Sequence, residues 1–206
     1  MVQKKAPRAR GRPRAYDPDA ALAGARDAFW RHGYSGTSLE ELSDATDMNR
    51  PSMYAAFGDK RALYLQTLDR YTQDAHVSIE RAMGGGRPLS EGLRRYYDFA
   101  LNIYFSGEAP RGCYLLGTAV TEAVADAEVA AKLLAALNSF ERAVEVRLRQ
   151  AQAAGELQDT ADPAALAMIA SSILHSIAVR SRAGESRAAV KAMADVAIQL
   201  ICGRRT

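Results

Sequence analysis

The chain has 206 residues, of which 48% are hydrophobic and 25% charged, and its formal net charge is +3. This composition suffices for a continuous buried core and excludes a wholly disordered chain. Uncharged apolar runs of about eighteen residues are absent, and the basic N-terminus lacks the apolar stretch of a secretory signal. We therefore expect a globular, cytoplasmic protein that does not contact a membrane.

The two cysteines and the histidines argue against a metal site and against catalysis. Cys113 and Cys202 are far apart and have no neighbour at metal-ligand spacing, so we expect two thiols, no disulfide, no metal and no other cofactor. The sequence contains no glycine-rich phosphate loop, no nucleophile elbow and no pair of histidines at ligand spacing. We do not expect an enzyme.

A basic arm occupies residues 1–16. Six cationic residues precede the first acidic residue, Asp17, and these are Lys4, Lys5, Arg8, Arg10, Arg12 and Arg14. We expect such a segment to be disordered in solution and attracted to nucleic acid, because neutralising phosphates releases condensed counterions. A solubilising tail is the alternative interpretation.

The rest of the chain predicts an all-α protein of about nine helices, because apolar residues recur with a 3.6-residue period and never alternate as in strands. Asp17 and Pro18 are an N-cap and a first-turn proline, and Gly33 ends this first helix. Residues 38–41 form a capping box that begins a short helix running to about Thr46.

Asn49 caps the next short helix, which accommodates Pro51 in its first turn and ends at the break marked by Gly58 and Asp59. A longer helix is expected over residues 60–83 and ends at the glycine run 84–86, which is the best internal boundary. Further helices are expected over residues 88–106, 113–124, 126–154, 162–183 and 185–202.

Two short helices separated by a three-residue break have the layout of a helix-turn-helix, whose second helix enters the major groove. Arg50 and Ser52 are left on the side that can face DNA. The spacing that would pack the pair against the first helix is carried by Leu39, Leu42, Ala45, Met48 and Tyr54. Capped helix pairs are common in all-α proteins, so this spacing alone is not unique.

Two sequence segments make the motif specific. Residues 29–42, FWRHGYSGTSLEEL, resemble the first half of the DNA-binding headpiece of the TetR/AcrR-like family of bacterial regulators. Residues 49–63, NRPSMYAAFGDKRAL, are similar to the recognition helix of that family and the start of its fourth helix. The resemblance implies a helix-turn-helix domain over 17–62 and an effector-binding and dimerisation domain over 63–206.

The resemblance further implies a transcriptional repressor, a homodimer that leaves a palindromic operator in double-stranded DNA when a small effector binds. A transcriptional activator and a nucleoid-like binder are the alternatives. The expected DNA contacts of the headpiece are Thr37, Ser38, Arg50, Pro51, Ser52, Tyr54 and Lys60. An arginine can read guanine bidentately, whereas lysine, tyrosine and the start of a helix bind phosphate.

The headpiece departs from the family pattern at two positions. Asp47 stands where a turn glycine is usual, which aspartate tolerates because it adopts left-handed conformations more readily than most residues. Ala56 stands where a histidine or tyrosine often touches phosphate. The arm can compensate, because Arg10, Arg12 and Arg14 lie in a segment that resembles an AT-hook, which fits the minor groove. Unspecific tethering by the arm is the alternative.

An effector cavity is expected in the C-terminal domain, with the lining residues Tyr96, Tyr97, Ala100, Ile103, Tyr104, Cys113, Leu116, Phe140 and His175. Such a lining suits a small apolar or aromatic compound held by a few hydroxyl groups. For each of these residues an ordinary core position is the alternative, and a lone histidine is often structural.

The segment Arg111-Gly112-Cys113 resembles one found in a subset of TetR-like regulators, some of which sense electrophiles or oxidants through cysteine. A cysteine at a helix start and near an arginine can have a lowered pKa and react fast. The alternatives are therefore a redox or electrophile sensor acting through Cys113 and a small core residue at this position.

By the same resemblance, the last two helices form the four-helix bundle of a homodimer. Their apolar stripes are Leu166, Ile169, Ile173, Ile177, Val190, Met193, Ala197 and Leu200. Two headpieces match a palindrome only at a fixed separation, so an effector that favours a splayed state would release the DNA.

Overall fold

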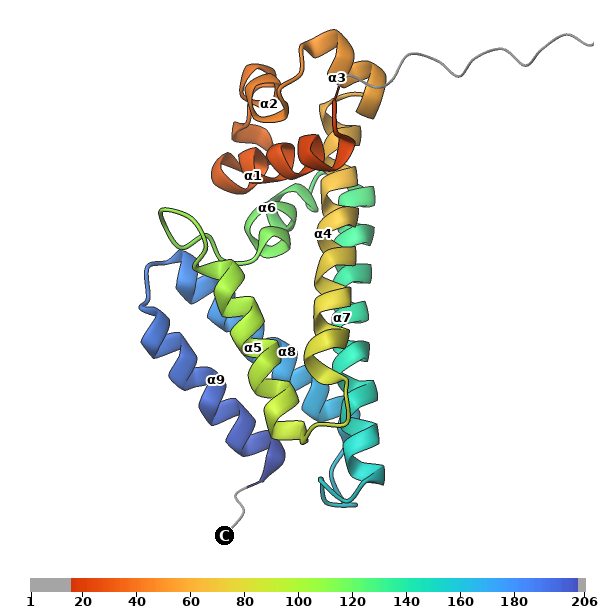
Figure 1. Cartoon of the computed structure of the whole chain (residues 1–206), viewed down its shortest axis with the longest axis vertical. Coiled ribbons are helices and arrows are strands. Elements are labelled where there is room, and N and C mark those ends of the chain that lie inside the picture. The colour runs from red at the N-terminus through yellow and green to blue at the C-terminus, as the bar shows by residue number, and fades with distance from the viewer. Residues whose placement is uncertain (1–15, 204–206) are drawn as a thin grey trace, which may run out of the picture.

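The computed structural model describes residues 16–203, and this part of the chain is all-helical (Figure 1). Its helices are α1 (Pro18–Gly36), α2 (Leu39–Thr46), α3 (Arg50–Phe57), α4 (Lys60–Met83), α5 (Leu89–Tyr104), α6 (Tyr114–Glu122), α7 (Ala127–Ala153), α8 (Pro163–Arg182) and α9 (Arg187–Cys202). The expected all-α class is confirmed. Arg10, Arg12 and Arg14 lie outside the described residues, so their minor-groove contact stays a prediction.

Local hydrogen bonds explain where the short helices of the headpiece begin. Ser38 Oγ accepts from the Glu41 amide at 3.1 Å, and the Glu41 carboxylate accepts from the Ser38 amide at 2.7 Å, so the expected capping box is confirmed. Asn49 Oδ1 accepts from the Ser52 amide at 2.9 Å and begins α3. Asp47 adopts the left-handed conformation, with φ 51°, as expected at the turn between α2 and α3.

The first helix differs from its expected end. Gly33 has φ 75° and ψ 170°, which interrupts α1, but one more helical turn follows and the element continues to Gly36. The Thr37 amide then donates to the Tyr34 carbonyl at 3.3 Å. The glycine therefore kinks the helix and does not terminate it.

Gly24 allows α1 and α2 to cross at close range. A Cβ atom at this position would overlap the Ala45 carbonyl group of α2. We expect Gly24→Ala to lower the free energy of unfolding by about 1–3 kcal/mol, because backbone atoms must move apart. Gly36→Ala in the same helix is the matched control, since its nearest neighbour would lie at 3.8 Å. Thermal unfolding of both variants measures the difference, and equal midpoints would contradict this packing argument.

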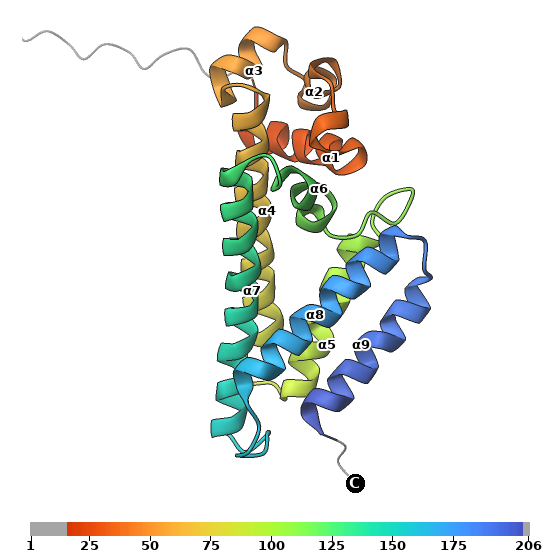
Figure 2. The same cartoon turned by 180° about the vertical axis from the view of Figure 1, so that it is seen from behind.

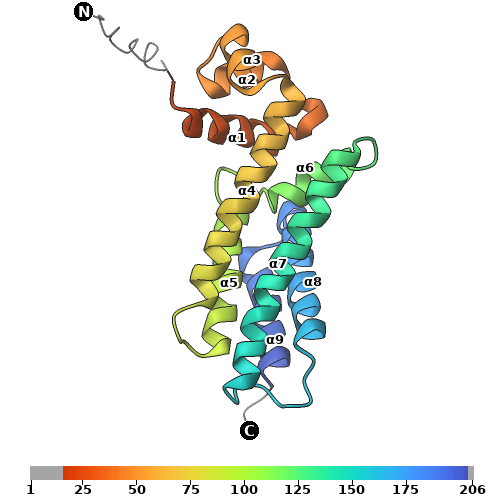
Figure 3. The same cartoon turned by 90° about the vertical axis from the view of Figure 1, so that its right-hand side faces the viewer.

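The C-terminal domain is built on the long helices α4 and α7, which lie side by side in all three views (Figures 1, 2 and 3). α5 and α8 pack against this pair and against each other, and α9 packs against α5 and α8. α6 lies under α1 at the junction with the headpiece. One hydrophobic cluster joins the headpiece to Tyr114 and Leu115 of α6, and a second cluster fills the C-terminal domain. The headpiece thus rests on a continuous core.

Among the described residues, α8 is the one helix that is long and apolar enough to span a membrane by length and composition alone. It packs against both α7 and α9, and Ala167, Ala170 and Ile177 are fully buried there. The apolar residues of α8 therefore divide into two groups. One group packs in the protein core, and the other forms an exposed face of the helix.

Candidate DNA-binding surface and effector cavity

The recognition helix α3 presents polar residues on a rigid base. Met53 and Phe57 are buried in the headpiece core and anchor the helix. Arg50, Pro51 and Ser52 are exposed at its first turn, beside the Asn49 cap. Tyr54 was expected to pack against α1, but 41% of its surface is exposed, so the packing interpretation is wrong and the ring is free for a DNA contact.

Thr37 and Ser38, in the turn before α2, were both expected to contact phosphate, but their side chains lie in different environments. Ser38 is exposed, and its oxygen caps α2. Thr37 is 1% exposed, and its hydroxyl donates to the Gly33 carbonyl at 2.6 Å. This burial contradicts the expected phosphate contact of the Thr37 side chain, which instead holds the kink of α1. The backbone hydrogen bond from Ser38 lowers the pKa of Glu41.

Lys60 begins α4 next to the headpiece. Its ammonium group lies over the Tyr34 ring, 4.6 Å from the centroid. Partial burial lowers the pKa of Lys60, and Glu122 and Glu41 oppose this shift. The aromatic face therefore positions the lysine, and its contact with the DNA backbone stays a prediction.

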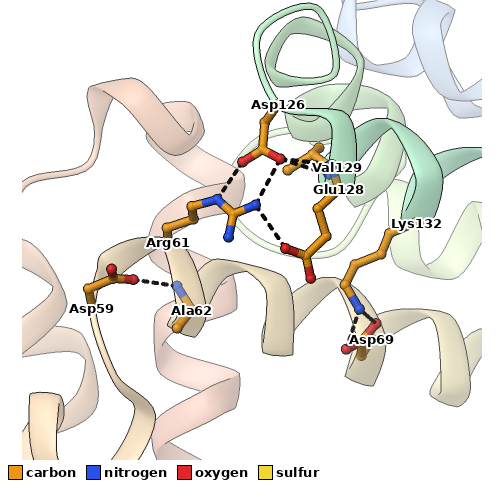
Figure 4. Close-up of polar contacts among 8 residues, drawn as sticks. All are labelled: Asp59, Arg61, Ala62, Asp69, Asp126, Glu128, Val129 and Lys132. Carbon is orange, nitrogen blue, oxygen red and sulfur yellow. Dashed lines mark hydrogen bonds and ion pairs between the residues drawn. The ribbon is translucent and has the colours of Figure 1, made fainter.

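A polar network ties the first turns of α4 to the start of α7 (Figure 4). Arg61 donates to both carboxylate oxygens of Asp126, at 2.6 and 2.9 Å, and to Glu128 at 2.8 Å. Hydrogen bonding to Arg61 lowers the pKa of Asp126 to about 2. Further along the same helices, Lys132 pairs with Asp69 at 2.7 Å. The network fixes where α4 leaves the headpiece.

A small apolar cavity of about 50 Å³ lies between α4, α5, α7 and α8. Seven of the expected residues line it, and these are Tyr96, Ala100, Ile103, Tyr104, Cys113, Phe140 and His175. Tyr97 does not line it, because its hydroxyl is turned to the Ala170 carbonyl at 3.0 Å. Leu116 packs against the hydrophobic core instead. Both of these pocket predictions are wrong.

Sequence reasoning missed one wall of the cavity altogether. Tyr71, Ala75 and Ile79 recur every four residues along α4, and this stripe was the signal that could have revealed them. Phe99, which belongs to the expected aromatic cluster of α5, also lines the cavity, and the other residues that were not expected are Leu115, Leu137 and Leu174. Because α4 also begins at the recognition helix, the cavity and the DNA-binding surface share one rigid element.

The cavity holds neutral polar groups at neutral pH. The Tyr71 hydroxyl lies 3.6 Å from Cys113 Sγ. Burial raises the pKa of Cys113 and of Tyr104, and burial lowers the pKa of His175. The lining therefore suits an uncharged ligand with few polar atoms.

The outer faces of α8 and α9, which lie side by side in Figure 2, expose apolar residues. Of the expected dimer residues, Ile169 and Leu200 are exposed, whereas Leu166, Ile173 and Met193 are partly buried against the protomer core. Three of the expected residues are fully inside that core, so their assignment was wrong: Ile177, Val190 and Ala197. The exposed face also contains Met168, Val179 and Val196, which sequence reasoning missed.

Comparison with known proteins identifies both halves of the chain. Residues 21–67 match the model of bacterial regulatory proteins of the tetR family, and residues 90–196 match the tetracyclin repressor-like C-terminal domain. The HTH-type transcriptional repressor ComR of Escherichia coli is 30% identical, over 94% of this chain and 92% of its own. BdcR of the same organism is 33% identical over 56% and 59% of the two chains.

Solved structures agree with these relatives. A cysteine mutant of the TetR family regulator CifR, complexed with 26-bp double-strand operator DNA, is 32% identical with a TM-score of 0.77. The match covers 91% of this chain and 98% of that one. The chain therefore belongs to the tetR family of bacterial regulatory proteins and is a DNA-binding transcription regulator, not an enzyme.

Proposed function

We propose that the protein is a cytoplasmic transcriptional repressor that binds a palindromic operator as a homodimer and leaves it when a small neutral effector enters the cavity. The observation that carries this proposal is the exposed first turn of α3, with Arg50, Pro51 and Ser52 on a helix anchored by Met53 and Phe57. Repressor relatives and the operator complex of CifR support it.

The dimer is supported by the apolar face of α8 and α9. Val179 is 61% exposed and Leu200 is 75% exposed, and Met168, Ile169 and Val196 extend this face along both helices. Exposed apolar patches of this extent on a soluble chain mark interaction sites. Two copies related by a twofold axis would cover the face with itself and hold the two headpieces at the fixed separation that a palindrome requires.

The effector is proposed from the lining of the cavity. A space of about 50 Å³ holds only a few atoms, so the ligand must be small or must push the walls apart. Tyr71 and Tyr104 offer hydroxyl groups, and the remaining lining is largely apolar. A compact neutral compound with one or two polar atoms fits this chemistry.

Sensing through Cys113 is the second candidate, because the thiol lies on the cavity wall. Burial raises its pKa, so less thiolate is present at neutral pH, and the thiolate is the reactive form. We expect Cys113 to be alkylated by iodoacetamide more slowly than an unperturbed thiol at pH 7.5, because less of it is thiolate. Alkylation should accelerate as the pH rises. Mass spectrometry of the Cys202→Ser variant, which retains a single thiol, measures the rate.

Release from DNA decides between the two candidates. Under the ligand proposal, hydrogen peroxide or N-ethylmaleimide should release the parent protein from DNA no more than it releases the Cys113→Ser variant. Fast alkylation, together with release that disappears in Cys113→Ser, would replace the effector proposal by the sensor.

The proposed function is tested by selecting bound fragments from the genome of the source organism with purified protein. Recovery of one palindrome, with repression of a reporter placed behind it, supports the proposal. Activation of the reporter would favour the activator. Diffuse binding that disappears with salt and lacks a common sequence would overturn sequence-specific repression.

A further inference from the structure

The segment between α5 and α6 joins the cavity to the headpiece. Tyr104 and Cys113 stand at its two ends, and both line the cavity. The amides of Arg111 and Gly112 donate to the Tyr104 carbonyl at 2.8 and 3.3 Å. These hydrogen bonds attach the backbone of Arg111 to the cavity wall.

Arg111 also contacts the headpiece, through three interactions with α1. Its carbonyl accepts from Trp30 Nε1 at 3.2 Å, and its guanidinium group lies 4.0 Å from the centre of the Trp30 ring. Arg111 Nη1 lies 3.2 Å from the carboxylate of Asp27, one turn earlier in the same helix. One residue thus binds α1 through a hydrogen bond, a ring contact and an ion pair.

The surroundings leave this segment little freedom to absorb a movement. Gly112 has φ 64°, and a Cβ atom there would lie 2.5 Å from the Ala178 carbonyl of α8, so the backbone is pressed against that helix. Trp30 in turn packs edge-on against Tyr71, with ring centroids 5.5 Å apart, and Tyr71 also lines the cavity. The cavity wall, Arg111 and α1 therefore form one continuous packed unit.

Other contacts across the same junction do not involve the cavity. Ser35 donates to Glu122 at 3.0 Å, and Arg61 pairs with Asp126 and Glu128. None of these five residues lines the cavity. They hold the headpiece in place without contacting the space that a ligand would fill.

We infer that Arg111 is the positioning residue that transmits the state of the cavity to the headpiece. An occupant larger than the present cavity displaces Tyr104 and Cys113, moves Arg111 with them, and rotates α1 together with the recognition helix. This inference rests on the proposed function, because it requires that filling the cavity weakens operator binding. It adds the route by which the effect reaches the DNA-binding surface.

A double-mutant cycle tests the route without an identified effector, because a side chain can fill the cavity. Ala100→Leu places an isopropyl group into a space of about 50 Å³. We expect it to weaken binding to the selected operator by about ten-fold in the parent, within the usual range of allosteric coupling. In the Arg111→Ala background the same substitution should change affinity by less than about two-fold, because the route is broken, and the difference from the parent is the coupling between the two residues. Fluorescence anisotropy at fixed salt measures the four dissociation constants.

Ser35→Ala is the matched control, because it also removes a junction contact but leaves the route intact. In that background Ala100→Leu should keep its full effect. Trp30→Phe is a second variant for the case that Arg111→Ala does not fold, since it removes the indole donor to Arg111 and keeps an aromatic ring at this position. It should reduce the effect of Ala100→Leu in part. Thermal unfolding shows that every compared variant is folded.

The outcomes separate the two proposals. If Ala100→Leu weakens binding equally in the parent, in Arg111→Ala and in Ser35→Ala, the route through Arg111 is wrong and effector control by the cavity stands. If neither Ala100→Leu nor Leu174→Phe, which fills the cavity from α8, changes operator affinity, cavity control and the route both fail.

Discussion

Arg50→Ala is expected to weaken operator binding by the dimer roughly 30-fold to 10⁴-fold. One arginine that reads a base contributes about 1–3 kcal/mol, and a palindrome engages the residue twice. Arg50 is exposed at the first position of α3 and makes no ion pair with any described residue, so its guanidinium group is available. The Asn49 cap fixes the backbone beneath it. Anisotropy titrations with the selected palindrome measure the loss.

Arg81→Ala is the control for this prediction, because it removes the same charge from the exposed last turn of α4, far from the headpiece. Its affinity should equal that of the parent. Titration with unrelated DNA separates base reading from phosphate binding, since loss of a base contact should leave unspecific affinity almost unchanged. Equal losses on both DNAs would show that Arg50 binds only phosphate.

Leu200→Asp is expected to dissociate the dimer and thereby abolish operator binding. The leucine is 75% exposed in the protomer and stands on the apolar face of α8 and α9. A carboxylate that is desolvated without a partner costs several kcal/mol, and the twofold axis introduces it twice, so the dimer dissociation constant should rise by at least about 10³-fold. Ile169→Asp on α8 should have the same effect. Light scattering coupled to size exclusion gives the mass of each variant.

Val124→Asp is the control for the dimer prediction, because Val124 is 90% exposed but lies between α6 and α7, away from the proposed interface. That variant should remain a dimer and bind the operator. A dimeric Leu200→Asp protein would move the interface elsewhere. A monomeric parent protein would overturn the homodimer itself.

Features that depend on a few neighbouring residues could be predicted from the sequence. The capping box of Ser38 and Glu41, the Asn49 cap and the left-handed Asp47 each follow from hydrogen bonds or sterics within about one turn of chain. For this reason the bounds of α2 and α3 agree with expectation. The exposed positions of Arg50 and Ser52 follow from the same local pattern, whereas the exposure of Tyr54 did not.

Part of the cavity was also within reach of the sequence, because the aromatic residues of α5 share one face. Tyr96, Ala100 and Tyr104 are four residues apart, and all of them line the cavity. The assignment of Tyr97 failed because a neighbouring position on the helix points to α8, where a carbonyl group accepts its hydroxyl.

Only the tertiary structure decided which apolar face of a helix turns inward. α8 and α9 are apolar on more than one side, so periodicity could not separate the buried Ile177 and Val190 from the exposed Met168 and Val196. The stripe of α4 that includes Tyr71, and the junction at Arg111, depend on residues distant in sequence. Helix caps are determined by the sequence itself because their partners are close along the chain, whereas cavities and interfaces arise only when separate helices pack together.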